Sequence, residues 1–478
     1  MFDFSILQKW AEVKPTEIAY QDSENQLTFA EFNSFTKRFA QFLRNKRIGE
    51  QNLVNIYLPS FLNWSGTLAA HMLGAITMSE KQVSQSLPLI IPDYHIAISA
   101  DPAIGNEKTI LIDAAILEEI KKTPEIDAYP SYESEDQIAR LISTSGTTGN
   151  KKFISITAGE IEATALRQGS WNLAGQGVNL SLFPLGSKQA YRNALQALRS
   201  GNTFYYNDFS DYRLAKLLRR HKINTVFGSP LQFSSLMDVI EHTGTELPHL
   251  KSVVIGGATP NLTLINRIKK HLDCKIYNAF GSTEAGNLGI FDITESNDFT
   301  LFDLNQNTIV EIVDEEGNLL PQNEYGFIRY QSPDMAKGYF KNQDMTKKFY
   351  KNGFFYTGDI GRIVSDNRLE LGGRADDVLN LDGVKVNAGD LDRIALAQLG
   401  VLDAAAFGLQ NDKGVTQLAY ALVVDSDFDL DFFGKVMHKK MPHKIEYIYK
   451  LKFLPRNEVG KLLRNDLAEF YANPASES

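Results

Sequence analysis

The alternation of amphipathic and apolar segments is the feature that most constrains how this chain can fold. Three stretches show the pattern: residues 29–44 before 53–57, residues 213–220 before 223–227, and residues 252–255 followed by 262–271 and 275–279. In each stretch a helix-like segment neighbours a short apolar run that is typical of a buried strand. Helices that alternate with buried strands favour parallel sheets covered by helices. The sequence therefore predicts an α/β fold with a large N-terminal domain of mixed or parallel sheets.

The pattern changes beyond about residue 372. Two helix-like segments, 389–399 and 430–437, now accompany three strand-like segments, 404–409, 417–424 and 444–454. Sequential strands of this kind favour a compact α+β unit. A chain of 478 residues is long enough for one large and one small domain. We predict a first domain at 1–375 and a small, mobile second domain at 376–478.

Charge and cysteine content exclude several classes of protein. The formal net charge of −9 argues against a surface that wraps nucleic acid. The single cysteine, Cys274, excludes an internal disulfide framework and favours a reducing compartment, so we expect a cytoplasmic protein. Residues 1–20 mix apolar and charged side chains, which predicts an amphipathic docking helix rather than a signal peptide. No apolar run approaches the roughly 20 residues that would predict a membrane span.

The sharpest local motif is Ser-Thr-Ser-Gly-Thr-Thr-Gly-Asn-Lys-Lys at residues 143–152. Glycines free backbone N–H groups, which together with hydroxyls can surround phosphate oxygens, while a lysine supplies positive charge. The motif differs from the Walker pattern because Gly146 and Gly149 lie too close together and a strand follows at 152–156. Thr157 and Glu160 then form a capping box that starts a helix. By itself the motif leaves two interpretations open, a phosphate loop and a solvated hairpin turn.

Four further segments combine residue types that suit a nucleotide site: 277–284, 356–359, 373–377 and 456–461. The first ends a strand with Glu284, the second places Asp359 in a tight turn, and the fourth sets Lys461 behind a glycine. Each segment alone has an ordinary explanation, such as a capping carboxylate, a turn, a solvated hinge or a solvated lysine. Only their combination is informative.

Taken in order, these five motifs resemble the adenylate-forming superfamily of acyl-CoA synthetases, peptide-synthetase adenylation domains and luciferases. The resemblance extends from Leu27-Thr-Phe-Ala-Glu31 to Lys461 and Arg464. It implies an enzyme that uses ATP and Mg²⁺ to convert a carboxylic acid into an acyl-adenylate and then passes the acyl group to a thiol.

The resemblance also implies roles for individual residues. The nucleotide-binding set is Thr144, Ser145, Gly146, Thr147, Thr148, Gly149 and Lys152 at the β- and γ-phosphates, Gly256, Gly257, Ala258, Asn278, Ala279, Phe280, Gly281 and Ser282 around the adenine, and Asp359 with Arg374 at the ribose. Thr283 would contact the α-phosphate and Glu284 would hold Mg²⁺. Lys461 would stabilise the negative charge that develops as pyrophosphate departs, because lysine carries a compact positive charge on a flexible side chain. Asp376 matches the hinge about which the second domain rotates.

The expected acid pocket comprises residues 183–191, 227–233, 256–258 and 278–282, a mainly apolar set that favours an aryl or aliphatic acid. Residues 182–191 contain no Asp or Glu to pair an amino acid's ammonium group, and they lack the histidine that many acyl-CoA synthetases carry there. Coenzyme A is the expected acceptor. The phosphopantetheine arm of an acyl carrier protein is the alternative, and a non-catalytic nucleotide-binding protein is the alternative from another class.

Overall fold

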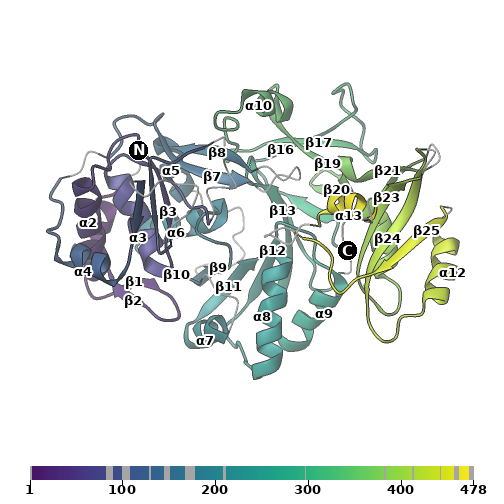
Figure 1. The fold of residues 1–478 in the computed structure, drawn as a ribbon, viewed down its shortest axis with the longest axis horizontal. Helices are drawn as coiled ribbons and strands as arrows, with labels where there is room; N and C mark the ends of the chain where they lie inside the picture. The colour runs from purple at the N-terminus through teal and green to yellow at the C-terminus, as the bar shows by residue number, and fades with distance from the viewer. Residues whose placement is uncertain are drawn as a thin grey trace.

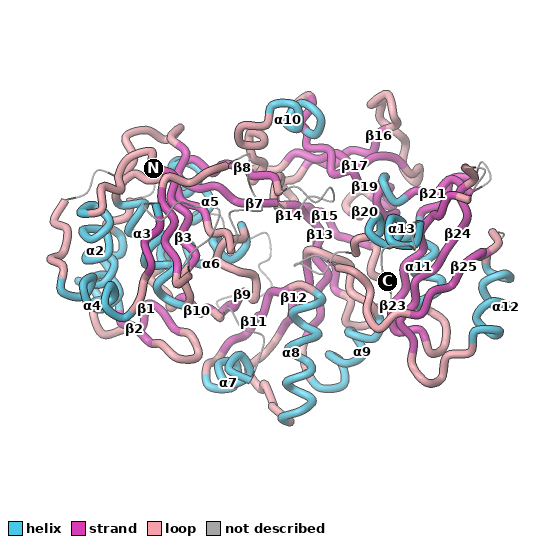
Figure 2. Tube along the Cα trace, in the orientation of Figure 1, coloured by secondary structure: helices cyan, strands magenta, loops and turns pink. Residues whose placement is uncertain are grey.

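The computed structural model describes residues 3–81, 90–99, 108–128, 131–144, 151–166, 178–207, 212–296, 298–381, 384–411, 414–441, 443–456 and 462–472. Within these ranges the chain forms two extensive sheets, a hairpin and a small third sheet, with helices packed around them (Figures 1 and 2). None of the helices in these ranges is both long and apolar enough to cross a membrane.

A six-stranded sheet forms the N-terminal part of the molecule. Its spatial order is β6 (Thr109–Leu111), β5 (Tyr94–Ala97), β3 (Leu53–Tyr57), β4 (Ile76–Met78), β7 (Ile138–Thr144) and β8 (Lys152–Thr157). All neighbours are parallel except β7 and β8, which pair antiparallel. The accompanying helices are α1 (Ile6–Val13), α2 (Phe29–Asn45), α3 (Ser60–Met72) and α4 (Ala114–Lys122). Helix α2 contacts the other three, so it organises the packing on this side.

A fourteen-stranded sheet runs through the middle of the molecule. Its first part contains β2 (Gln26–Thr28), β1 (Ile18–Gln21), β10 (Phe204–Tyr206), β9 (Val178–Ser181), β11 (Ile223–Gly228), β12 (Ser252–Gly256) and β13 (Lys275–Ser282). The strands from β1 to β13 in this order are parallel. The helices between them in sequence are α5 (Ala158–Leu166), α6 (Lys188–Ser200), α7 (Tyr212–Arg220), α8 (Pro230–Thr243) and α9 (Leu262–His271). This is the helix and strand alternation that the sequence predicts.

The same sheet continues as antiparallel strands beyond β13. They are β14 (Gly286–Asp292), β15 (Leu301–Leu304), β20 (Arg368–Arg374), β19 (Phe354–Ser365), β17 (Gly326–Gln331) and β16 (Ile309–Val313), with β18 (Tyr350–Lys351) paired to β19. Helix α10 (Gln343–Phe349) connects β17 to β18 and lies above this part of the sheet (Figure 1).

The C-terminal part is built from sequential strands. A 3-10 helix at Ala375–Asp377 leads into a hairpin of β21 (Val378–Leu381) and β22 (Val384–Asn387). A three-stranded sheet of β23 (Val401–Gln410), β24 (Thr416–Val424) and β25 (Ile445–Lys450) follows, with helices α11 (Ala388–Leu396), α12 (Leu430–Lys440) and α13 (Arg464–Ala472). In Figure 1 these elements occupy the side opposite α2.

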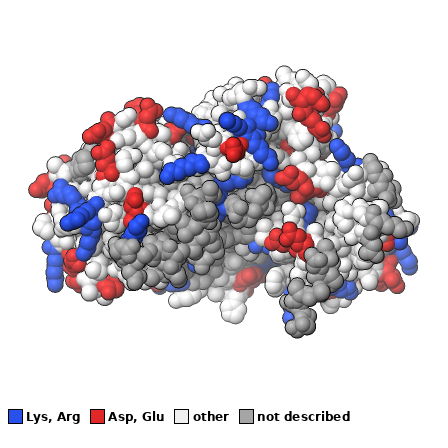
Figure 3. All heavy atoms as spheres, turned by 45° about the horizontal axis from the view of Figure 1, so that its top comes forward, with Lys and Arg blue, Asp and Glu red and all other residues white. Residues whose placement is uncertain are grey.

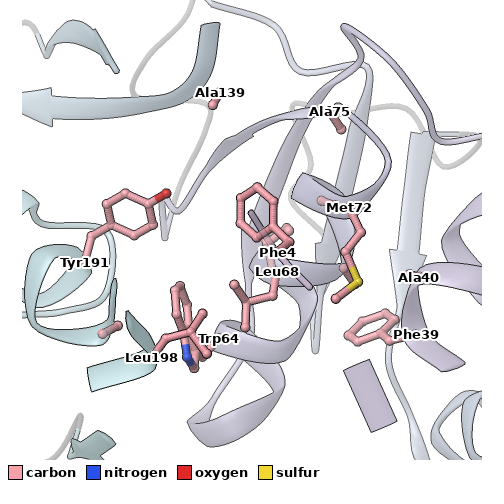
Figure 4. Close-up of a cluster of buried hydrophobic side chains, with 14 of the residues drawn as sticks. Phe4, Phe39, Ala40, Trp64, Leu68, Met72, Ala75, Ala139, Tyr191 and Leu198 are labelled. Atoms are coloured by element: carbon pink, nitrogen blue, oxygen red, sulfur yellow. The ribbon is translucent and has the colours of Figure 1, made fainter. Parts of the chain in front are cut away.

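Buried apolar side chains form separate clusters. The largest joins the six-stranded sheet to α6 and contains Trp64, whose ring meets that of Tyr191 edge to face at 6.1 Å between centroids (Figure 4). Two other clusters draw all their members from residues 379–471. Among the described residues, none of the clusters combines side chains from both sides of Ala375–Asp377. This separation supports the predicted boundary, which stays a prediction.

The predicted fold class, a large α/β part followed by a small α+β part, is confirmed. Two local predictions are wrong. Tyr356–Asp359 does not form a tight turn but lies inside the long strand β19, where Gly358 adopts a φ of +74° that bends the strand without ending it. The strand predicted at 444–454 ends at Lys450. The amphipathic N-terminal helix exists but covers only Ile6–Val13.

Candidate active site

The carboxyl ends of four parallel strands meet at one edge of the large sheet. The pairs Phe227 with Ser181, Gly228 with Ile255, and Gly256 with Ala279 align the ends of β9, β11, β12 and β13. Ligands of α/β proteins bind at the carboxyl ends of parallel strands. All four segments predicted to line the acid pocket continue from this edge, so the fold brings together stretches that are up to 100 residues apart.

Two positions at this edge require glycine because of their backbone angles or the closeness of a neighbouring strand. Gly257 has a φ of +84°, which a residue with a side chain rarely adopts. At Gly281 an added Cβ would lie 2.5 Å from the carbonyl oxygen of Gly286, because β13 and β14 approach each other closely. Gly257 thus leaves the turn after β12 without a side chain, and Gly281 allows β14 to pack against β13.

Asn278 and Phe280 direct their side chains into the protein. The side-chain amide of Asn278 donates a 2.8 Å hydrogen bond to the carbonyl oxygen of Phe299 and is buried. The ring of Phe280 packs against that of Phe302, with 5.2 Å between centroids. At these two positions the predicted adenine site can therefore offer mainly backbone atoms.

Several hydrogen bonds fix the loop that carries Thr283 and Glu284. The Tyr339 hydroxyl donates a 2.8 Å hydrogen bond to Oε1 of Glu284, and the amide of Ala336 donates to the Glu284 carbonyl oxygen at 2.7 Å. The Lys188 ammonium donates to the carbonyl oxygens of Thr283 at 2.9 Å and Asp334 at 2.8 Å. The carboxylate of Glu284 is thus presented from a braced loop.

Lys188 is partly buried, and loss of solvent around its ammonium lowers its pKa to about 8. Its position at the start of α6 falls within residues 183–191, the stretch interpreted as apolar pocket lining. The stretch predicted to line the acid pocket therefore carries a partly buried amine. No pattern in the sequence marks it, because its partners are backbone oxygens from distant segments.

The two lysines that follow the phosphate loop have different surroundings. Lys151 forms a 2.6 Å ion pair with the buried carboxylate of Glu80. Lys152 instead lies over two aromatic rings, 4.7 Å from the centroid of Phe349 and 5.5 Å from that of Tyr339. Burial is the main cause that lowers the pKa of Lys152, and the neighbouring Glu284 carboxylate opposes it. Lys152 and Glu284 are therefore electrostatic neighbours.

Residues 145–149 of the predicted phosphate loop lie outside the described residues, and so does Lys461. The strands on either side of the loop are described, and Thr144 pairs with Lys152 across β7 and β8. The segment between them therefore joins two antiparallel strands. The predicted capping box is present, since the amide of Thr157 donates to Glu160 at 2.8 Å and that of Glu160 to Thr157 Oγ1 at 3.3 Å.

Asp359 in the middle of β19 and Arg374 at the end of β20 are opposite each other and form an ion pair. Arg374 Nη1 lies 3.0 Å from Asp359 Oδ1 and donates a second hydrogen bond, also 3.0 Å, to the carbonyl oxygen of Thr357. Asp359 is 9% exposed. Arg374 is among the charges that affect the pKa of Lys152, which places this pair close to the lysine. The structure thus brings together four of the predicted residues: Lys152, Glu284, Asp359 and Arg374.

The residues around the predicted hinge connect to the segment that follows Lys461. Asp376 lies in the 3-10 helix between β20 and β21. Arg464 at the start of α13 pairs with Asp392 at 2.8 Å and with Asp377 at 3.4 Å. Arg464 therefore ties the chain just beyond Lys461 to the residue that follows Asp376.

The acidic residues fit a magnesium ion that is held mainly by phosphate oxygens. Within the described ranges, no group of three or more His, Cys, Asp or Glu residues could hold a metal by itself. Mg²⁺ is commonly bound by one or two carboxylates together with substrate phosphates and water. Glu284, a hard oxygen donor beside Lys152, suits that arrangement.

A parallel strand edge with a hydrogen-bonded carboxylate, an adjacent lysine and a partly buried Asp–Arg pair is typical of an α/β enzyme that binds a nucleotide. The chain belongs to the AMP-binding enzyme family, whose model matches residues 7–340. The predicted membership of the adenylate-forming superfamily is thereby confirmed.

Individual relatives agree with this assignment. Bacitracin synthase 2 of Bacillus licheniformis is 24% identical over 97% of this chain, which spans only 19% of that protein's length. The 4-chlorobenzoate–CoA ligase of an Arthrobacter species is 24% identical over 99% of this chain and 96% of its own length. The structure of o-succinylbenzoate CoA synthetase from Bacillus subtilis, in complex with the acyl-adenylate intermediate, has a TM-score of 0.80, with 20% identity and 97% of each chain covered. That likeness concerns the fold.

Proposed function

We propose that this protein uses ATP to convert a carboxylic acid into an acyl-adenylate and then transfers the acyl group to the thiol of coenzyme A. The observation that carries the proposal is the convergence of Lys152, Glu284 and the Asp359–Arg374 pair beside the carboxyl ends of β9 to β13. These are charges suited to a triphosphate and a ribose, next to a mainly apolar pocket for an acid.

Each residue has a role in the first step. An oxygen of the acid, already ionised at neutral pH, attacks the α-phosphorus of ATP, and the bond to pyrophosphate breaks. Lys152 and the 144–149 loop bind the β- and γ-phosphates, Thr283 binds the α-phosphate, and Asp359 with Arg374 binds the ribose. Glu284 would hold a magnesium ion, which would supply neutralising charge to the phosphate oxygens. Lys461 stabilises the developing negative charge, and no general acid or base is required.

The second step uses the predicted division of the chain. In the proposal, residues 376–478 form a mobile domain that rotates about Asp376, withdraws Lys461 and opens access for the thiol. The separate hydrophobic clusters on either side of Ala375–Asp377 support a hinge at this point. Rotation there breaks few apolar contacts, so its free-energy cost is small.

The acid is an aryl or aliphatic one. Residues 182–191 provide no carboxylate for a substrate ammonium group, and the positive charge of the partly buried Lys188 amine would repel such a group. Amino acids are therefore disfavoured as substrates.

A carrier protein is the second candidate acceptor. It is favoured by relatives such as bacitracin synthase 2, of which this chain corresponds to about a fifth. Coenzyme A and a carrier protein present the same thiol arm, so the reacting residues do not distinguish them.

The test is pyrophosphate release from ATP and Mg²⁺ with a panel of aryl, short-chain, fatty and amino acids, with and without coenzyme A. We expect release with an aryl or aliphatic acid that is faster when coenzyme A is present, and loss of release in Lys461→Ala by roughly 10²-fold or more. Acceleration only by a phosphopantetheinylated carrier would identify the second candidate. If ATP bound but none of the acids in the panel gave pyrophosphate release, the proposal would be contradicted and a non-catalytic nucleotide-binding protein would be favoured.

A further inference from the structure

Two lysines from distant parts of the chain share one aromatic ring. Lys152 at the start of β8 places its Nζ 4.7 Å from the centroid of Phe349, and Lys348 in α10 places its Nζ 5.5 Å from the same centroid. Cations are attracted to aromatic faces, which can hold both amines in one region. The hydroxyl group of Tyr339, whose ring also contacts Lys152, holds Glu284 in the same region.

Neither amine has a carboxylate partner among the residues that the structure describes, in contrast to Lys151, which pairs with Glu80. Like charges held close together repel one another. Burial is the largest cause that lowers the pKa of Lys152; the Glu284 carboxylate opposes it, and the Lys348 and Arg374 charges add to it. A polyanion bound beside Lys152 and Lys348 would offset the repulsion between these two amines.

The surrounding surface is locally basic although the whole chain is acidic. Lysine and arginine side chains gather on the face that carries α10 (Figure 3). The lysines between β17 and β19 are Lys337, Lys341, Lys347, Lys348 and Lys351. A positively charged patch attracts anionic ligands and raises their local concentration.

A simpler explanation for Lys348 is the helix dipole. Lys347 and Lys348 both lie in the last turn of α10, where cations are favoured. The dipole accounts equally for both lysines, whereas only Lys348 shares the Phe349 ring with Lys152. Both lysines are exposed. Lys347 is therefore a matched control with the same charge in the same turn of the helix.

We propose that Lys348 is a second polyphosphate-binding cation, which acts with Lys152 across Phe349 on the terminal phosphates of ATP and on the pyrophosphate leaving group. The inference rests on the proposed function for the identity of the ligand. It assigns α10, which has no part in the motifs of the sequence, to the phosphate end of the site. AMP lacks these terminal phosphates and does not reach Lys348.

The test measures binding of pyrophosphate, MgATP and AMP to the full chain by calorimetry, in wild type, Lys348→Ala and Lys347→Ala. We expect Lys348→Ala to weaken pyrophosphate and MgATP binding by roughly threefold to tenfold, because one exposed charge-assisted contact is lost. AMP binding should be unchanged, and Lys347→Ala should bind all three ligands like wild type. Lys348→Arg, which keeps the charge, should restore most of the affinity.

Two results overturn the proposal: wild-type pyrophosphate binding by Lys348→Ala, or equal weakening by Lys347→Ala. Adenylate formation by the wild-type protein is measured separately with the acid panel. Lys348-dependent pyrophosphate binding without any adenylate would contradict the proposed function and support the assignment of Lys348. Adenylate formation by the wild-type protein, together with unaltered pyrophosphate binding by Lys348→Ala, would support the proposed function and contradict the assignment of Lys348.

Discussion

The hydroxyl group of Tyr339 donates a 2.8 Å hydrogen bond to Oε1 of Glu284, and the ring of the same tyrosine lies 5.5 Å from the amine of Lys152. One side chain therefore contacts the predicted metal-binding carboxylate and a predicted phosphate-binding lysine. Tyr339 reaches both because its backbone pairs with Ile154 of β8, two residues beyond Lys152.

Tyr339→Phe removes the hydrogen bond but keeps the ring. We expect a severalfold higher Mg²⁺ concentration for half-maximal adenylation, because Glu284 loses a positioning contact, and a loss of stability of at most about 1.5–3 kcal/mol, the contribution of a hydrogen bond to a charged group. A Mg²⁺ titration of pyrophosphate release measures the effect. Tyr350→Phe is the control, since that hydroxyl lies 3.5 Å from the backbone oxygen of Glu284 rather than its carboxylate. Identical titrations for Tyr339→Phe and wild type would show that the bond does not position Glu284.

Asp359→Asn tests the proposed ribose contact. The substitution keeps the shape of the side chain but removes the charge that pairs with Arg374, so we expect ATP affinity to fall by at least tenfold. Equilibrium binding of ATP measures the change. Asp303→Asn is the control because Asp303 pairs with Arg368 on the same strand, β20, yet is no part of the predicted site. Equal affinities for ATP in Asp359→Asn and wild type would remove Asp359 from the nucleotide site.

Asp376→Pro tests the hinge. Proline restricts the backbone angle that a rotation must change, while Asp376 touches none of the reacting atoms in the proposed first step. We expect adenylate formation to remain largely intact and thioester formation to be strongly impaired. Single-turnover assays of the two half-reactions separate these effects. Equal loss of both half-reactions would rule out a role confined to domain rotation.

Arg464→Met tests the anchor that follows Lys461, the lysine predicted to be catalytic. Arg464 and Asp392 form an ion pair and are both largely enclosed, with 11% and 13% of their side chains exposed. Removal of one partner of a buried pair costs about 3–5 kcal/mol, so we expect the C-terminal part to unfold at lower denaturant concentration. Arg393→Met, which breaks an exposed pair with Asp390 on the same helix, should cost at most about 1 kcal/mol. Similar denaturation midpoints for the two variants would contradict the anchoring role.

His71 gives the stability a defined pH dependence. Its Nδ1 lies 2.6 Å from the Tyr132 hydroxyl and its Nε2 lies 3.1 Å from that of Tyr191. Burial, aided by the charge of Arg140, lowers the pKa of His71 well below its ordinary value. The unfolded chain therefore binds the proton more readily, and the stabilisation present above about pH 6.5 is lost as the pH falls toward the lower folded-state pKa.

The prediction is a smaller loss of stability between pH 7.5 and about 5.5 in His71→Gln than in wild type. The difference is at most about 1.4 kcal/mol per pH unit below 6.5, since one proton is involved. Denaturant unfolding across this pH range measures it, with His242→Gln, an exposed histidine, as the control. Parallel pH profiles for His71→Gln and wild type would show that His71 does not carry this dependence.

The sequence by itself determined the fold class and most of the elements around the site. Residues 29–44 and 262–271 carry helical periodicity with capping side chains, and the structure places helices at Phe29–Asn45 and Leu262–His271. These elements were predictable because propensity, periodicity and capping are local and agree with one another. The order of five motifs also identified the family and the segments that meet at the strand edge.

Only the tertiary structure decided which side chains surround those motifs. No sequence pattern marks Lys188, Tyr339 or Lys348 as neighbours of the site. Lys188 contacts Thr283, Tyr339 contacts Glu284 and Lys152, and Lys348 shares the ring of its neighbour Phe349 with the distant Lys152. The segment Tyr356–Asp359 contains turn-forming residues, yet pairing with β17 and β20 on either side keeps it in a strand. Hydrogen bonds and ring contacts between distant segments depend on how the sheets and helices pack, and local sequence preferences do not encode them.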